Sequence, residues 1–297
     1  MSLVIRIVFF GIMGIAAGAL AWPFAETVLY LQADFPSLLL FNAALGVAIG
    51  LFMGGVFGMT EGVVSGSRVK MRSGAFTGMA VGAVGGVAGF VAGQAALLAV
   101  GTTFFHSQAG FQTVGIPVSR ALGWAGFGMF IGMAEGIRSR SGARVRNGII
   151  GGFLGGVLGG LLVEYLRIAW PENVMARLGG LCLLGLLVGV LYGIVELRFT
   201  RAYLHLLGGR AGGREYPLSQ KVTIIGGSEK TAVTLPGYRN VADEHAVITR
   251  KGDAFVLTDS GTRKATYVND RSVDRTELQD GDVIRVGDAQ FQFRKKQ

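Results

Sequence analysis

Three glutamates with matching surroundings are the side chains of this sequence best placed for chemistry in a membrane. Glu61, Glu135 and Glu196 each follow a glycine by three residues, near the end of a long apolar run. A carboxylate at the centre of a bilayer costs at least about 2.5 kcal/mol, so its recurrence suggests an ion or proton path. The alternative is that the three lie at interface depth and pair with the nearby arginines, Arg68, Arg138, Arg146 and Arg198. Glu164 and Arg167 have the spacing of a helical ion pair.

The other reactive side chains indicate no catalytic or metal site. Cys182 is the only cysteine and lies in an apolar run, so it predicts packing and excludes an intrachain disulfide. His106, His205 and His245 are far apart and lack the spacing of metal ligands. The sequence has neither a nucleophile elbow nor a phosphate-binding loop with its lysine. We therefore expect no cofactor, no metal and no enzymatic activity.

The composition is that of a membrane protein. The chain has 297 residues, of which 51% are hydrophobic and 49 are glycine, with a formal charge of +9. The basic residues before position 202 lie mainly in short loops, which membrane topology explains better than nucleic-acid binding does. With neither a basic helix nor an aromatic stacking platform, a nucleic-acid partner is not expected.

A hairpin repeats along the first two thirds of the chain. Residues 128–160 align with 54–86 without a gap, the first half recurs from Gly189, and a weaker second half starts at Arg6. The alignment places Glu135 on Glu61 and Arg144 on Lys70, and it keeps the glycines in register.

Glycine recurs at every fourth position of these segments. In lipid, such a stripe lets helix backbones approach closely, whereas in water each glycine costs roughly 1 kcal/mol against alanine. The pattern predicts glycine-zipper membrane helices. The stripes are Gly46, Gly50, Gly54, Gly58 and Gly62; Gly74, Gly78, Gly82 and Gly86; Gly148, Gly152, Gly156 and Gly160; and Gly185, Gly189 and Gly193.

Six segments have about the 20 residues that a membrane helix needs. They are 3–21, 37–64, 74–100, 121–137, 148–168 and 178–197, within a predicted membrane domain of residues 1–202. Trp22-Pro23 is expected to end the first helix. Basic residues follow the second, fourth and sixth helices, whereas the opposite loops carry only Arg120 and Arg177. The positive-inside rule then places both termini in the cytoplasm of an inner-membrane protein. An outer aromatic belt is predicted from Trp22, Phe104, Phe105, Phe111 and Trp170.

After Arg201 the pattern changes to short alternating runs separated by turn residues. The runs begin at Tyr203 and predict an all-β sandwich over residues 203–297. Further strands are predicted at 222–225, 246–249, 254–257, 266–268, 282–285 and 291–293. No helix of any length is expected there.

This carboxy-terminal region resembles a forkhead-associated (FHA) domain, a β-sandwich that in its family recognises phosphothreonine peptides through loops at one end. The resemblance is carried by Ile225-Gly226, by VADEHAVI at 241–248, by DSGTRKATYVND at 259–270 and by LQDGDVIRVG at 278–287. It implies a protein-interaction module and covers about a third of the chain. Residues that keep the family pattern and support its loops are Gly226, His245, Thr266, Tyr267 and Asn269.

The positions that contact phosphate in the family are all changed. Its arginine falls at Gly227, its serine at Ala242, the next contact residue at Asp243, and its Thr-Asn pair at Arg263 and Lys264. A phosphate dianion needs several donors or cations, which these replacements largely remove. A substitute basic pocket from Arg239, Arg263 and Lys264 remains an alternative. His245 is interpreted as a loop brace.

Two functions follow. The first is a non-enzymatic inner-membrane scaffold that displays a degenerate FHA domain to cytoplasmic protein partners. The domain is expected to bind these partners independently of phosphate. Glycine grooves left at the outer surface of the helix bundle would allow a second copy to pack there and form a homo-oligomer. Membrane lipid is the other expected partner. The second is an ion or proton channel, or a transporter, that uses Glu61, Glu135 and Glu196 with the FHA domain as a regulatory module.

Overall fold

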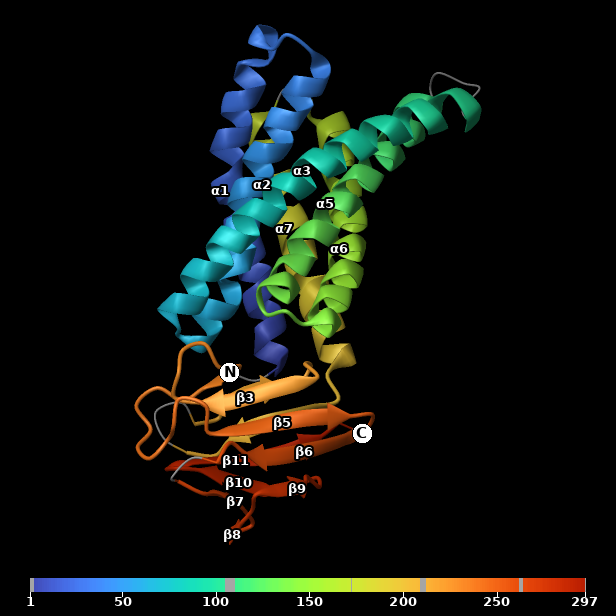
Figure 1. The fold of residues 1–297 in the computed structure, drawn as a ribbon. Helices are drawn as coiled ribbons and strands as arrows, with labels where there is room; N and C mark the ends of the chain where they lie inside the picture. The colour runs from blue at the N-terminus through green and yellow to red at the C-terminus, as the bar shows by residue number, and fades with distance from the viewer. Residues whose placement is uncertain (1–2, 105–109, 172, 209–211, 262–263, 297) are drawn as a thin grey trace. The chain divides into compact units, whose positions relative to one another are not determined.

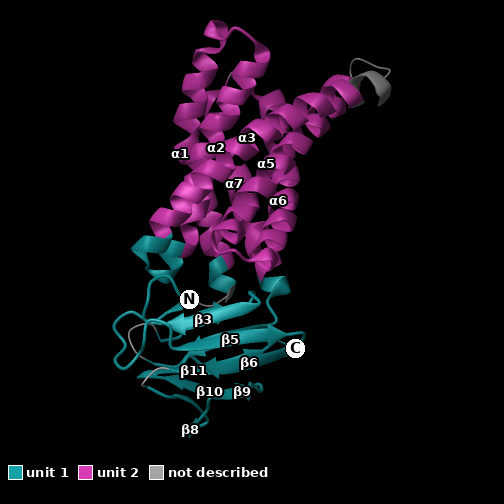
Figure 2. Ribbon diagram, in the orientation of Figure 1, with its two compact units in different colours: residues 1–6, 62–70, 197–297 teal, residues 7–61, 71–196 magenta. Residues whose placement is uncertain are grey.

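The structure is a computed structural model that describes residues 3–104, 110–171, 173–208, 212–261 and 264–296. The predictions for Phe105, His106 and Arg263, and that for the side chain of Phe104, lie outside the described part. The chain forms two compact units, coloured separately in Figure 2. One comprises residues 7–61 and 71–196, and the other comprises residues 1–6, 62–70 and 197–297.

Among the described residues, six helices are long and apolar enough to cross a membrane, as the sequence predicted. A short 3-10 turn, η1 (Gln32–Asp34), follows the first helix, and a π-helical stretch, η2 (Phe111–Gly115), leads into the fourth spanning segment. The helices, labelled in Figure 1, are α1 (Leu3–Tyr30), α2 (Leu38–Ser65), α3 (Arg68–Phe104), α5 (Ile116–Arg138), α6 (Gly142–Ala169) and α7 (Val174–Phe199).

The predicted end of α1 at Trp22-Pro23 is wrong, because the helix continues through Pro23 to Tyr30. Proline cannot donate the backbone hydrogen bond of its position. The side chains of residues that flank Pro23 make hydrogen bonds that support the segment instead. The Trp22 indole donates to the Glu26 carboxylate at 3.1 Å, and the Thr27 hydroxyl donates to the Pro23 carbonyl at 2.8 Å.

Helices α3 and α6 begin earlier than the expected positions 74 and 148. The Ser67 hydroxyl accepts a hydrogen bond from the Lys70 amide at 3.1 Å, and the Ser141 hydroxyl accepts one from the Arg144 amide at 3.4 Å. A serine in this position satisfies an amide that would otherwise lack a partner at the start of a helix. Arg68, Lys70, Arg72, Arg144 and Arg146 therefore lie within the starts of these two helices and not in loops.

Glycines bring helix backbones into direct contact in several pairs of helices, among them α2 with α3, α5 with α6, and α1 with α7. A Cβ atom built on one glycine of each pair would lie far inside van der Waals distance of the facing carbonyl oxygen. These distances are 2.1 Å from Gly54 to Gly78, 2.2 Å from Gly128 to Gly152 and 2.0 Å from Gly14 to Gly185. Helices α1 and α7, the first and the last, thus pack by the same kind of contact as the helices of the hairpins α2–α3 and α5–α6.

The β-sandwich has two sheets, ordered β2-β1-β11-β10-β7-β8 and β4-β3-β5-β6-β9. Neighbouring strands are antiparallel except β3 and β4, which are parallel. The strands are β1 (Ala202–Leu206), β2 (Glu215–Pro217), β3 (Val222–Gly226), β4 (Val233–Thr234), β5 (Ala246–Lys251), β6 (Ala254–Asp259), β7 (Thr266–Val268), β8 (Arg271–Ser272), β9 (Arg275–Glu277), β10 (Val283–Val286) and β11 (Ala289–Lys295).

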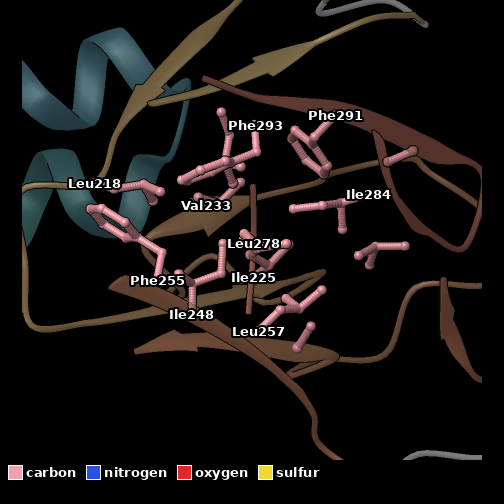
Figure 3. Close-up of a cluster of buried hydrophobic side chains, with 14 of the residues drawn as sticks. Leu218, Ile225, Val233, Ile248, Phe255, Leu257, Leu278, Ile284, Phe291 and Phe293 are labelled. Atoms are coloured by element: carbon pink, nitrogen blue, oxygen red, sulfur yellow. The ribbon is translucent and has the colours of Figure 1, made fainter. Parts of the chain in front are cut away.

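Alternating residues of both sheets point inward and form the sandwich core, part of which Figure 3 shows. Phe291 and Phe293 of β11 are fully buried, as is Leu257 of β6. The predicted strands are confirmed in position. The strands β2, β4, β8 and β9 were not predicted, because two or three residues are too few to show an alternation.

Within the unit that holds the sandwich, residues 62–70 are tied to the loop between β3 and β4. The Glu229 carboxylate accepts hydrogen bonds from the Ser67 hydroxyl at 3.0 Å and from the Val69 amide at 3.2 Å. The buried Lys70 ammonium donates to the Thr234 hydroxyl at 2.8 Å. These contacts satisfy a lysine that would be costly to bury alone.

Candidate interaction loops and membrane carboxylates

The loops after β3 and before β5 are fixed to each other by their backbones. A Cβ atom on Gly226 would lie 2.0 Å from the carbonyl oxygen of Asp243, so only glycine fits there. The next amide, of Gly227, donates to the carbonyl of Ala242 at 2.9 Å. Two of the five positions where the sequence analysis expected phosphate contacts to be lost are therefore directly bonded to each other.

His245 connects three segments of this end of the sandwich. It is fully buried, and its Nδ1 atom accepts a hydrogen bond from the Ala242 amide at 3.1 Å. Its amide donates to Ile225, and its carbonyl accepts from Ser260. Burial lowers the pKa of His245, although the nearby Asp259 carboxylate acts in the opposite direction. A neutral ring with an accepting Nδ1 atom acts as a brace between loops.

Asp259 and Thr266 shape the loop between β6 and β7. The Asp259 carboxylate accepts hydrogen bonds from the Gly261 amide at 2.7 Å and from the Thr266 amide at 2.8 Å and hydroxyl at 2.5 Å. Burial alone would raise the pKa of Asp259, but these hydrogen bonds outweigh it and hold the pKa below its usual value. The carboxylate is thus engaged by its own loop.

Asn269 and Asp270 form the turn between β7 and β8. Both have positive φ values, 50° and 63°, as a type I′ hairpin turn requires. The Asn269 amide group donates to Asp282 at 2.8 Å and accepts from the Val283 amide at 3.0 Å. On β7, the Tyr267 ring carries the Arg285 guanidinium 3.9 Å from its centroid.

The proposed substitute basic residues lie on different loops. The carbonyl of Arg239 accepts from the Asp288 amide at the turn between β10 and β11, whereas Lys264 belongs to the loop between β6 and β7. Both side chains are exposed. Gly227 and Ala242 offer no side-chain donor, and the exposed Asp243 adds negative charge beside them. Among the described family contact positions, only Lys264 is cationic.

Residues 223–287 match the sequence model of the FHA domain family. This chain carries an FHA domain. FHA domains are protein-interaction modules, so the resemblance inferred from the motifs is confirmed. A comparison with curated proteins finds no match.

Solved structures of FHA domains are similar to the carboxy-terminal third of the chain. A domain from work on phosphothreonine-dependent FHA interactions is 33% identical, with 33% of this chain and 99% of that chain covered and a TM-score of 0.31. The FhaA FHA domain, solved with the intracellular domain of Rv3910, is 32% identical, with 31% and 99% covered and a TM-score of 0.29. The FHA domain of the Chlamydia trachomatis protein CT664 is 22% identical, with 33% and 99% covered and a TM-score of 0.31.

The FHA domain should lose stability in mild acid through His245. Its pKa is lowered on folding from the ordinary value of 6.5, so below that pH the unfolded chain binds a proton that the folded chain does not. The free energy of unfolding should be steady above pH 7 and fall as the pH drops through the pKa of the unfolded histidine. Hydrogen exchange of the β5 and β6 amides in the full chain measures this. A His245→Gln variant should lose the slope, and an unchanged slope would contradict the prediction.

In the unit of residues 7–61 and 71–196, called the membrane unit from here on, Glu135 is held in a buried ion-pair network. Its carboxylate accepts hydrogen bonds from Arg138 Nε at 2.8 Å, from Arg138 Nη2 at 2.6 Å and from Arg144 Nη1 at 3.1 Å. Glu61, Glu135 and Glu196 all attract the Arg144 guanidinium electrostatically. The structure therefore gathers the three recurring glutamates around one arginine on α6.

Sequence reasoning missed the central position of Arg144. It offered Arg146 as a partner, but that side chain is exposed, whereas Arg144 is only 7% exposed. The available signal was the alignment of Arg144 with Lys70, which also becomes buried at the start of a helix. Among the described residues there is no group of three or more histidine, cysteine, aspartate or glutamate side chains arranged to hold a metal ion.

A small cavity adjoins this network. It measures about 20 Å³ and is lined by Thr60, Glu61, Glu135 and Tyr192, among others. A cavity of at least about 10–15 Å³ can hold one water molecule when polar groups surround it. The cavity beside the network can therefore hold a water molecule.

Proposed function

We propose that this protein is a membrane scaffold that presents an FHA domain for phosphate-independent contact with protein partners. The observation that carries the proposal is the combination of six apolar helices with an FHA domain whose phosphate positions carry Gly227, Ala242 and Asp243. The helices anchor the chain in a bilayer, and the FHA domain supplies the interaction surface. Loss of a guanidinium and of a hydroxyl removes the donors that a phosphate requires.

The loop architecture supports an interaction role even without phosphate. Gly226, His245 and Asp259 each maintain loop geometry through hydrogen bonds or close backbone contacts. A loop surface that is rigid in the free protein loses less conformational entropy on binding. Partner recognition then relies on backbone groups and on exposed side chains such as Asp243 and Lys264.

The distribution of arginine and lysine supports placing the FHA domain in the cytoplasm, with the helices in a bacterial-type inner membrane. The ends of α5 and α7 and the starts of α3 and α6 carry these residues, while the opposite connections carry few. Homo-oligomer formation and contact with membrane lipid are further parts of the proposal, supported by the apolar side chains that the helices expose.

A channel or transporter using Glu61, Glu135 and Glu196 is the second candidate, favoured by the gathering of these residues beside a small polar cavity. The neighbouring turns argue for the scaffold. About two turns inward of Glu61 and Glu135, Met53 and Phe127 are fully buried, as is Val188 inward of Glu196 on α7. Apolar packing of this kind blocks ions.

Partner capture before and after phosphatase treatment tests the leading proposal. The full chain in lipid nanodiscs should retain the same cytoplasmic proteins from treated and untreated extracts, because the contact positions lack phosphate ligands. An Asp243→Lys variant should lose these partners, whereas Glu277→Lys, an equal charge reversal on the exposed β9 strand, should keep them. Capture that disappears after phosphatase treatment would contradict phosphate independence.

A further inference from the structure

A large cavity lies within the membrane unit, away from the glutamate network. Its volume is about 600 Å³, and residues from all six membrane helices line it. Sites for small molecules typically measure about 300–1,000 Å³ and combine apolar walls with a few polar groups. This cavity has the size and the lining of a ligand site.

The path of α3 explains why the cavity exists. Its first half packs on α2 down to the contact of Gly86 with Gly46, and its later part packs on α5, where a Cβ on Gly89 would lie 2.6 Å from the carbonyl oxygen of Gly123 (Figure 1). Because α3 crosses from α2 to α5, the amino-terminal part of α2 is left without this neighbour. Space opens there, and Leu38, Phe41 and Leu45 of α2 line it.

One wall of the cavity carries guanidinium groups around a buried carboxylate. Glu164 is 4% exposed and accepts hydrogen bonds from Arg167 Nε at 3.0 Å and Arg120 Nη1 at 3.3 Å. The indole of Trp124 also points to it, at 3.5 Å. A guanidinium has five N–H donors, so the arginines keep donors that Glu164 does not engage. The side chain of Arg120 is 40% exposed and that of Arg167 is 42% exposed.

Asn42 supplies an independent sign of a ligand. The residue lines the cavity from α2 and is 7% exposed, and its Nδ2 atom has no hydrogen-bond partner among the described residues. A buried amide without a partner is costly, so such a group is expected to meet an acceptor. The acceptor must come from whatever fills the cavity.

The charge and the walls define the occupant. Arg120, Arg167 and Arg177 face the cavity with Glu26 and Glu164, which leaves an excess of one positive charge. The Arg177 guanidinium is paired with Glu26 at 2.6 and 2.7 Å. Most other lining residues are apolar. An occupant therefore needs an anionic, acceptor-rich end and a long apolar part.

We propose that the cavity binds an anionic phospholipid, with its phosphate on Arg120 and Arg167 and an acyl chain along the apolar wall. Asn42 donates to an oxygen of the head group. The bilayer that surrounds the helices supplies the lipid. The bound lipid fills the space that the crossing of α3 leaves open and satisfies the donors of the wall.

Native mass spectrometry of the purified full chain, delipidated and then given phosphatidylglycerol or phosphatidylcholine, tests the proposal. We expect one phosphatidylglycerol per chain to be retained at concentrations about tenfold lower than phosphatidylcholine, because both lipids carry a phosphate but the excess positive charge of the cavity repels the choline cation. Arg167→Gln combined with Asn42→Leu should remove this preference. Arg146→Gln, the same change on an exposed arginine outside the cavity, should preserve it.

Leu45→Trp, which fills the apolar wall without changing its charge, should reduce retention of phosphatidylglycerol. Equal retention of both lipids by the wild-type chain, or an unchanged preference in the double variant, would overturn the proposal. Glycerol phosphate, the head group without acyl chains, is the third probe. It should fail to compete, and competition equal to that of the whole lipid would also overturn the proposal. Thermal unfolding of each variant identifies any that fail to fold.

Discussion

A Gly152→Val variant should fail to form the folded membrane unit. A Cβ atom at this position would lie 2.0 Å from the carbonyl oxygen of Gly128, so α5 and α6 would have to separate. Overpacking typically costs about 1–3 kcal/mol, and a clash with backbone that cannot rotate away lies at or above that range. The yield of monodisperse protein in detergent and its thermal unfolding temperature measure the effect.

Gly179→Val is the matched control, because a Cβ atom on Gly179 of α7 would meet nothing within 4 Å. This variant should unfold at nearly the wild-type temperature. If the two valine variants behave alike, the glycines matter through helix propensity alone, and close backbone packing does not stabilise the helices.

A Glu135→Ala variant should be strongly destabilised. It leaves Arg144 buried after loss of the carboxylate that accepts its hydrogen bond at 3.1 Å, and it removes both bonds from Arg138. Breaking a buried ion pair by removing one partner costs about 3–5 kcal/mol. Thermal unfolding of the full chain in detergent checks this, with Asp34→Ala, at an exposed carboxylate, as the control.

Substitutions of the membrane glutamates also separate the two candidate functions. The scaffold account expects Glu135→Ala to lower stability while liposomes with the wild-type chain carry no proton or cation flux. Flux through the wild type that stops when Glu61, Glu135 and Glu196 become glutamine, with stability unchanged, would favour the channel.

The sequence predicted what depends on local pattern. Apolar length located all six helices, and alternation with turn residues located β1, β3, β5, β6, β7, β10 and β11. Helix ends were less predictable, since the caps at Ser67 and Ser141 and the side chains around Pro23 decide them over single hydrogen bonds.

Long-range arrangement was beyond the sequence. The gathering of Glu61 and Glu196 around Arg144 depends on which helices become neighbours, and helical periodicity does not specify this. The pairing of α1 with α7 and the large cavity have the same origin, because both follow from the order of helices around the unit. In the FHA domain, by contrast, the resemblance assigned Gly227 and Ala242 to the family's phosphate-contact positions, and the structure joins them by a hydrogen bond.

The most direct test of the account is binding of phosphothreonine peptides and their unphosphorylated counterparts to the full chain in nanodiscs. A library of such pairs, measured by fluorescence anisotropy, should show less than about a threefold preference for phosphate, since Gly227 and Ala242 provide no ligand for it. A preference of roughly a hundredfold or more for any phosphorylated member would contradict the account.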